Sequence, residues 1–254
     1  MVLELNALYL YAQDPEDRSR HCSSNLSTNN IDAIFEEVSI NDNDQMLVSS
    51  NNSIVPLSSA DAIGSFFSSY TFRVLYLEVT GMCCRLVAPL MKYAIENSIE
   101  IRVVYSEPKE YLLREFQKEG LNKDLSESVA GVNPLPGFIR LVPFKEEPLF
   151  VTLLGFEGGR FSYLVTNKQP SYDKILPIVG VPGYRMYYPF ETFWGNRNAL
   201  KTTKAYERVV YAEANSIVDS LLIVREDSYD KREPNMIVAQ LGLNLMRLEL
   251  SCML

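Results

Sequence analysis

The chain has 254 residues, 47% of them hydrophobic and 22% charged, and its net charge is -8. These values exclude wholesale disorder, and the acidic balance disfavours a general affinity for nucleic acid, because phosphate binding needs concentrated Lys and Arg. The four cysteines form no C-x-x-C pair, and no apolar run approaches the ~20 residues of a membrane-spanning helix. We therefore expect a reduced, cytoplasmic protein with no membrane partner.

Residues 1–57 carry the weakest pattern in the chain and are expected to form an irregular N-terminal portion. Residues 2–11 predict a strand, although a helix also fits them. Residues 14–30 are polar and predict a loop. Short elements are expected at 31–38 and 45–49, on either side of a turn-rich segment.

The clearest pattern lies in residues 72–108. A helix that starts near Ser59, with a serine cap and a first-turn acid, leads into it. Apolar and β-branched residues at 73–79 predict a strand buried on both faces. Apolar residues spaced three and four apart after Cys84 predict an amphipathic helix, and 101–105 predicts the next strand. Together these elements form one βαβ unit.

Strands and helices keep alternating after this unit. A helix around residues 111–116 and a linker-like stretch at 122–137 come first. The pattern then predicts strands at 149–154, 175–179, 208–211 and 236–239, helices at 161–165, 192–201 and 216–225, and a last apolar segment at 243–250. This alternation predicts an α/β fold: a Rossmann-like three-layer sandwich, with a mostly parallel sheet and helices on both faces, as a single domain over residues 1–254.

A single histidine, His21, restricts the chemistry further. One histidine cannot supply the two or three ligands that many catalytic zinc sites use, and it lies far in sequence from Cys83 and from the serines at strand ends. We therefore predict no metal site. The chain also lacks the P-loop pattern G-x-x-x-x-G-K-[ST] and the dinucleotide-binding pattern G-x-G-x-x-G. The sequence therefore does not identify a cofactor.

Ligands of open α/β sheets bind outside the carboxyl ends of the strands. After the first clear strand, Thr80 offers a hydroxyl, Gly81 permits close backbone approach, and the N-terminus of the next helix presents N–H groups to an anion. Each glycine that follows a strand is explained equally well by the need to turn. The predicted ligand-binding residues at strand ends are Glu78, Thr80, Gly81, Glu107, Gly155, Glu157, Gly158, Gly180, Gly183 and Asn215.

Three carboxylates, those of Glu78, Glu107 and Glu157, would ring one edge of the predicted sheet and hold a polar small molecule. Glu157 could accept a hydrogen bond from a ribose or base, bind a divalent cation with another acid, or act as a general base. A first-turn helix acid that interacts with the helix dipole explains Glu157 equally well. Glu157 and Glu107 are the candidate catalytic residues.

Two other clusters have a packing interpretation beside a functional one. Cys83 and Cys84 begin a helix, a position that can activate a thiol, but we favour the interpretation that one or both are small buried hydrophobes. The aromatic residues of one segment are interpreted as core or interface packing in preference to base stacking; they are Tyr187, Tyr188, Phe190, Phe193 and Trp194.

The segment LEVTGMCCR at residues 77–85, continued by VVYSEP, resembles the CRISPR-associated Rossmann-fold domains that sense ligands in bacterial defence systems. Members of that family have a strand that ends in a Thr-Gly turn and then a helix with a basic residue. The resemblance implies a nucleotide ligand over the carboxyl edge of the sheet and a homodimer. Thr80 and Gly81 would hold the ligand and Arg85 would be the basic residue. The chain departs from the pattern at Met82, where the family has a second glycine.

Three functions stay open on the sequence. The first is a nucleotide- or small-molecule-recognising component of a bacterial defence or signalling assembly. The second is a carboxylate-dependent hydrolase or glycosidase that uses Glu157 or Glu107. The third is a ligand-free structural subunit of a protein complex. The expected partners are a nucleotide ligand, and either further copies of the chain or another protein.

Overall fold

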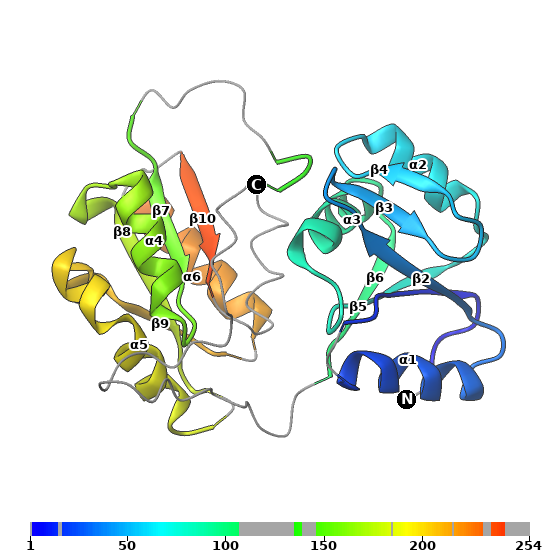
Figure 1. Ribbon diagram of the computed structural model, residues 1–254, viewed down its shortest axis with the longest axis horizontal. Helices are drawn as coiled ribbons and strands as arrows, with labels where there is room; N and C mark the ends of the chain where they lie inside the picture. Colours follow the sequence, from blue (N-terminus) through cyan, green and yellow to red (C-terminus); the bar gives the residue numbers. More distant parts are fainter. Residues whose placement is uncertain are drawn as a thin grey trace. The chain divides into compact units, whose positions relative to one another are not determined.

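The structure is a computed structural model that describes residues 2–14, 17–106, 135–138, 146–183, 185–214, 216–230 and 235–241 (Figure 1). The predicted helix near 111–116, most of the linker-like stretch and the last apolar segment at 243–250 lie outside the described residues.

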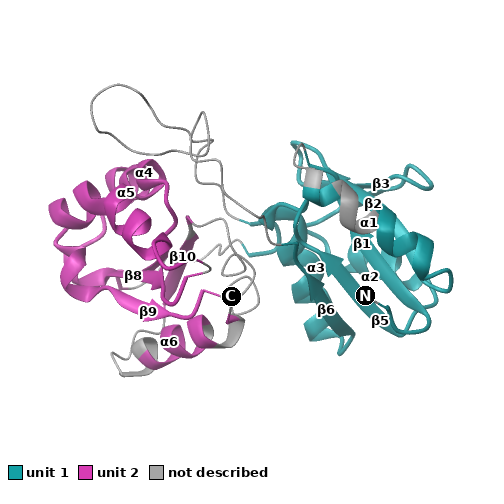
Figure 2. Cartoon of the chain, turned by 90° about the horizontal axis from the view of Figure 1, so that it is seen from below, with its two compact units in different colours: residues 1–110, 134–139, 254 teal, residues 111–133, 140–253 magenta. Residues whose placement is uncertain are grey.

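The chain divides into two compact units (Figure 2). Unit 1 is built mainly from residues 1–110, and unit 2 mainly from residues 140–253. Each unit has a sheet of its own, whereas the sequence predicted one domain with one sheet. The alternation of strands and helices reads the same whether the strands join one sheet or two.

Unit 1 contains a mixed sheet in which six strands are described, in the order β4-β3-β2-β1-β5-β6. The strands are β1 (Ala7–Tyr11), β2 (Ile34–Ile40), β3 (Gln45–Val48), β4 (Ile54–Pro56), β5 (Val74–Glu78) and β6 (Glu100–Val104). β1 runs parallel to β2 and β5, and β5 runs parallel to β6. β3 and β4 extend the sheet in antiparallel fashion beyond β2. The predicted strand at 2–11 and the short elements at 31–38 and 45–49 thus correspond to β1, β2 and β3. With β4 they make the described part of residues 1–57 a regular part of the sheet, and not the irregular portion that the sequence predicted.

The helices of unit 1 are α1 (Asp17–Asn29), α2 (Ala60–Ser68) and α3 (Cys84–Glu96). α2 begins as predicted, because the Ser59 hydroxyl accepts a hydrogen bond from the Ala62 N–H at 3.2 Å. The β5-α3-β6 unit is also confirmed. α1 replaces the predicted loop at 14–30. Its Leu26 packs with Tyr9 and Tyr76 on one face of the sheet, but the helix is otherwise so polar that no apolar period marks it.

Unit 2 contains a parallel sheet in which four strands are described, in the order β10-β7-β8-β9. The strands are β7 (Leu149–Leu153), β8 (Ile175–Gly180), β9 (Val210–Ala212) and β10 (Met236–Gln240). The helical elements are α4 (Gly158–Lys168), α5 (Tyr188–Thr202), α6 (Ile217–Asp230) and the short 3-10 turns Tyr172–Lys174 and Ala205–Arg208. All the elements predicted between residues 149 and 239 are present, with shifted ends.

The core of unit 2 forms two clusters, because successive strand residues point to opposite faces. One cluster joins Ile175 and Val179 of β8 to residues of α4 and α5, including Phe161 and Leu200. The other joins strand residues of β7 and β8 to Val224 of α6. These findings establish an α/β protein with a mixed sheet and a parallel sheet, an arrangement compatible with a Rossmann-like fold.

Candidate ligand-binding site

Unit 1 has a topological switch point between β1 and β5. The chain leaves β1 through α1 to reach β2 on one side, and it leaves β5 through α3 to reach β6 on the other side. Two neighbouring parallel strands whose connections diverge leave a crevice outside their carboxyl ends, and ligands of such sheets bind there. In unit 1 this place is the edge where β1 ends at Tyr11 and β5 ends at Glu78, which are paired residues.

Glu78 is the last residue of β5 and is wholly buried. Neither of its carboxylate oxygens makes a hydrogen bond of regular geometry with the protein. Burial raises the pKa of this carboxyl above its ordinary value, and the Thr80 hydroxyl, the Thr80 N–H and the charge of Arg18 only partly oppose that effect. Thr80 is therefore only a weak partner of Glu78, because neither its hydroxyl nor its N–H forms a hydrogen bond of regular geometry with the carboxylate.

A second buried glutamate in unit 1 shows what a satisfied carboxylate looks like. Glu36 of β2 is 3% exposed. It accepts hydrogen bonds from the Ser50 N–H at 3.1 Å, the Ser50 hydroxyl at 2.7 Å and the Tyr70 hydroxyl at 2.8 Å. The burial of Glu36 is therefore accounted for, because each of its carboxylate oxygens accepts a hydrogen bond. The carboxylate oxygens of Glu78 accept none of regular geometry.

The turn after β5 packs tightly on the end of β1. A Cβ atom added at Gly81 would overlap the backbone carbonyl oxygen of Ala12, and it would lie 3.0 Å from the side chain of Ser19. Only glycine fits such a close approach of two backbones. Gly81, predicted as a ligand residue, is thus required by packing at the switch point itself.

Arg18 of α1 reaches across to the end of β6. Its guanidinium donates hydrogen bonds to the Tyr105 hydroxyl at 3.2 Å and to the Ser106 carbonyl oxygen at 3.0 Å, and it lies over the Tyr105 ring. The Thr80 hydroxyl accepts a hydrogen bond from the Ser106 N–H at 2.9 Å. A cation, two hydroxyl groups and a buried carboxyl therefore meet at this edge.

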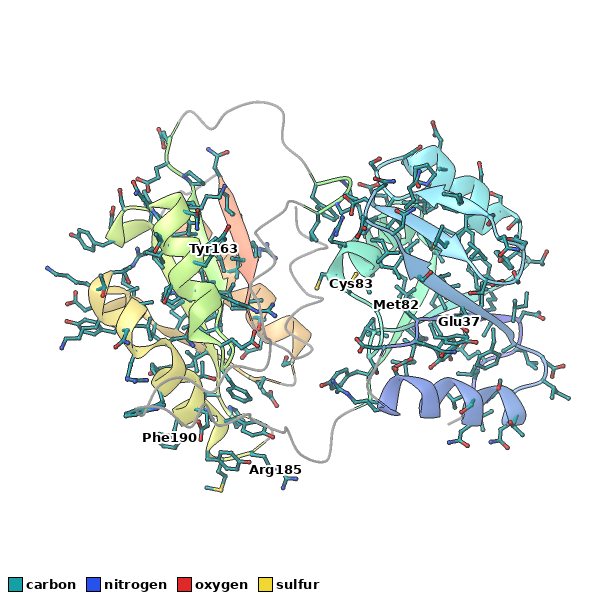
Figure 3. All side chains as sticks on the ribbon, in the orientation of Figure 1. Glu37, Met82, Cys83, Tyr163, Arg185 and Phe190 are labelled. Carbon is teal, nitrogen blue, oxygen red and sulfur yellow. The ribbon has the colours of Figure 1, made fainter. Side chains whose placement is uncertain are left out.

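The N-terminus of α3 lies at the same edge, directly after β5. Its N-cap residue, Cys83, makes no capping hydrogen bond with its side chain, and the thiol is exposed (Figure 3). The prediction that one or both of these cysteines are buried is thus wrong for Cys83, and Cys84 is only partly buried. Arg85 in the first helical turn is paired with Asp44, with 2.6 Å between Nε and Oδ1. Arg85, the basic residue predicted to bind the ligand, is therefore already engaged by a carboxylate of the protein.

The carboxyl edge of the parallel sheet in unit 2 carries the other predicted residues. Glu157 is the N-cap of α4, is 3% exposed, and forms an ion pair with Arg160 one turn later. Since a buried carboxylate with a cation beside it is satisfied electrostatically, the explanation of Glu157 as an acid at the start of a helix accounts for what is observed.

One predicted glycine of unit 2, Gly158, is explained by helix packing. A Cβ atom at Gly158 would overlap the Gly195 carbonyl oxygen of α5, and one at Gly195 would overlap the Phe156 carbonyl oxygen. The Asn196 side-chain amide donates to the Gly155 carbonyl oxygen at 2.7 Å. α5 therefore packs directly against the turn at 155–158.

The remaining predicted residues are spread over different parts of the chain. Gly180 ends β8, where it pairs with Ala212, and Gly183 follows two residues after Val181. Glu107 and Asn215 lie outside the described residues. The expectation that the carboxylates share one sheet edge is wrong for Glu78 and Glu157, because β5 and β7 belong to different sheets.

The sequence did not predict Arg18 as part of the unit 1 edge, and it marked the strand end at Tyr105 without giving Tyr105 a role. Arg18 was overlooked because 14–30 was expected to be a loop. The run Asp14-Pro15-Glu16-Asp17 was a usable signal, since a helix commonly begins with an Asp cap, proline at the first helical position and acids in the first turn.

Within the described part of the chain, no group of three or more His, Cys, Asp or Glu side chains could hold a metal ion. In the same part, no helix is long and apolar enough to cross a membrane. Comparison of the chain with protein-family models, with curated proteins and with solved structures gives no match.

Proposed function

We propose that unit 1 recognises a small polar ligand of the nucleotide class at the carboxyl edge between β1 and β5. The observation that carries this proposal is Glu78, a wholly buried carboxyl without a regular hydrogen bond at the topological switch point. A buried polar group without partners costs stability, about 1–3 kcal/mol, and such groups concentrate at functional sites. Glu36 in the same unit shows that the fold can satisfy a buried glutamate.

The neutral form of Glu78 suits a nucleobase. Burial raises the pKa of this carboxyl and so favours its protonated form. A protonated carboxyl donates one hydrogen bond and accepts another, which matches the paired N–H and C=O of an amide-like base edge. Because Glu78 is buried, the ligand would reach it by displacing Arg18 from Tyr105 and Ser106.

The opposite end of the ligand would carry negative charge. The exposed N-terminus of α3 has N–H groups that point away from the helix and a favourable dipole for an anion. Arg18, once released, would supply a guanidinium for a phosphate. We propose further that the fold is a Rossmann-like three-layer sandwich. As the resemblance implies, the protein would be a ligand-recognising component of a bacterial signalling or defence assembly.

A thermal-unfolding screen tests the proposal. The natural chain is heated with nucleosides, nucleoside mono- and diphosphates, cyclic dinucleotides and, as the anion control, inorganic phosphate. A ligand that binds only the folded state at 100 times its Kd adds about 2.7 kcal/mol of stability, which is a shift of several degrees. We expect a shift with at least one nucleotide that exceeds the shift with inorganic phosphate.

Two matched variants assign the shift to the site. Arg18→Gln should reduce the nucleotide-induced shift, whereas Arg102→Gln should retain it, because Arg102 pairs with Glu4 and Glu100 away from the carboxyl ends of the strands. Equal shifts in both variants, or no shift with any nucleotide, would count against the proposal.

A further inference from the structure

The helix α5 and the two residues before it leave large apolar side chains exposed. Met186 is 94% exposed, Phe190 74%, Trp194 56% and Tyr187 52%. Figure 3 shows Phe190 at the outer side of unit 2, pointing away from the ribbon. Large apolar side chains that gather exposed on one helix mark a candidate interaction site.

The other side of α5 is already used within unit 2. Thr192, Gly195, Asn196 and Ala199 are buried, and the close contact between Gly195 and Phe156 fixes the helix against the turn before α4. The exposed side chains therefore lie on a second face of a helix whose position is set. They are not core residues that have failed to pack.

The exposed face has the spacing of a coiled-coil seam. Tyr187, Phe190, Trp194, Arg197 and Lys201 follow one another at steps of three, four, three and four residues, and we call this set the α5 seam. Tyr187 is the N-cap and already has helix-like torsions, with φ of -90° and ψ of -11°. A strict alternation of three and four keeps side chains on the line along which two helices pack knobs into holes.

The chemistry of the α5 seam changes along the helix. Its N-terminal part is aromatic and its C-terminal part is cationic, with Arg197 and Lys201. The Arg197 guanidinium lies 4.1 Å from the centre of the Trp194 ring, so this cation already uses an aromatic ring as its partner. The same set of side chains thus offers both members of a cation–π pair.

We propose that the α5 seam pairs in antiparallel fashion with the α5 seam of a second copy of this chain. With Phe190 of one copy opposite Trp194 of the other, the same register places Tyr187 opposite Arg197, since both pairs are centred on the same position. A parallel arrangement would instead place Arg197 on Arg197 and Lys201 on Lys201, which is repulsive. Four of the five seam residues, all but Lys201, are of types enriched at protein interfaces.

Analytical ultracentrifugation of the full chain over a range of concentrations tests the pairing. The natural chain should show a reversible monomer–dimer equilibrium. Trp194→Glu and Phe190→Glu should each raise the dimer dissociation constant at least about tenfold, as loss of a hot-spot side chain does. Tyr172→Glu is the matched control, because Tyr172 is 62% exposed in the same unit but lies outside the seam, and it should leave the equilibrium unchanged.

A disulfide cross-link distinguishes the two orientations. In chains whose four natural cysteines are replaced by serine, Tyr187→Cys is mixed with Arg197→Cys under mild oxidation. The antiparallel register predicts a cross-linked dimer from the mixture and little from either variant alone, because equivalent positions are then ten residues apart in register, about 15 Å along the helix. Cross-linking of each variant with itself would overturn the antiparallel pairing.

Two further results would overturn the proposal. One is a natural chain that stays monomeric at all concentrations. The other is a dimer that Trp194→Glu and Phe190→Glu leave intact. If the chain is monomeric and sediments with anionic phospholipid vesicles, and both variants abolish that binding, the seam is a membrane-binding face and the self-pairing is refuted.

Discussion

Glu78 and Glu36 are both buried in unit 1, yet only Glu36 has regular hydrogen-bond donors around it. This difference supports the proposed site, because the fold satisfies one buried carboxylate and leaves the other, at the switch point, with no hydrogen bond of regular geometry. The closest polar neighbours of Glu78 are Thr80 and the charge of Arg18. Arg18 itself is held by Tyr105 and Ser106.

The pH dependence of stability follows from Glu78. Its pKa in the folded protein lies above the ordinary value of 4.5, so the protonated form is favoured by folding. The resulting stability is fully present below the unfolded-state pKa and is lost as the pH rises through the folded-state pKa. Glu78→Gln should therefore match the natural chain most closely at pH 4.5, the acid end of the range, and should have the higher Tm at pH 8.

Thermal unfolding of both chains at several pH values between 4.5 and 8 measures this difference. Equal Tm differences at every pH would show that ionisation of Glu78 does not limit stability. The comparison uses the difference between the two chains, so that titration of other groups cancels.

Gly81 is the second residue whose role can be isolated. Gly81→Ala places a methyl group against the Ala12 carbonyl oxygen, which is backbone and cannot rotate away, so we expect a loss of about 1–3 kcal/mol in the free energy of unfolding. Gly64→Ala is the control, because its Cβ would meet the movable Tyr93 hydroxyl and alanine gains about 0.5–1 kcal/mol over glycine inside a helix. Urea unfolding of both variants decides the matter, and a Gly81→Ala chain as stable as the natural one would contradict the close packing.

At the level of elements, α5 has one side packed within unit 2 and another side exposed. Its buried side fixes the turn at 155–158 through Gly195 and Asn196, and its exposed side forms the α5 seam. Glu157 lies in that turn, paired with Arg160. The hydrolase alternative stays a prediction: Glu157 is paired with Arg160, and the other candidate acid, Glu107, lies outside the described residues.

Glu157→Gln separates a structural role from a catalytic one. The substitution leaves Arg160 without its partner carboxylate beside a buried position, so we expect unit 2 to lose about 1–3 kcal/mol of stability. Urea unfolding measures the loss. An unchanged stability together with loss of a hydrolytic activity of the natural chain would favour the catalytic interpretation instead.

The sequence predicted those elements whose periodicity is strong. β5, α3 and β6 were predicted because apolar residues repeat at the spacing of a strand or a helix. α1 was missed because Leu26 is almost alone among its described side chains in packing on the core. The strand ends were predicted well enough to identify Glu78, Thr80 and Gly81, but Arg18 depended on α1 and was therefore missed.

The order of the strands could not be predicted in the same way. Whether β5 and β7 share a sheet depends on contacts between residues far apart in sequence, and the local pattern is identical in both cases. The predicted ring of carboxylates failed for this reason. Gly158 was predicted as a ligand residue because it follows a strand. Its role in packing depends on its contact with Gly195, which is far away in sequence and cannot be read from the local pattern.

At the level of the whole molecule, two units with separate sheets and separate cores are the main finding. Compact units with their own cores commonly unfold as separate cooperative transitions. Scanning calorimetry of the natural chain should therefore resolve two transitions, of which Gly81→Ala lowers one and Gly195→Ala lowers the other. A single transition that both variants lower equally would show that the units unfold together.

Titration calorimetry measures the proposed binding of a nucleotide-class ligand to unit 1 beside Glu78. The nucleotide with the largest thermal shift is titrated into the natural chain, into Glu78→Leu and into Glu36→Gln. We predict saturable binding to the natural chain, at least tenfold weaker binding to Glu78→Leu, which removes both the donor and the acceptor at that position, and retained binding to Glu36→Gln. No heat of binding with any nucleotide, or equal affinity for the natural chain and Glu78→Leu, would refute the proposed ligand site beside Glu78.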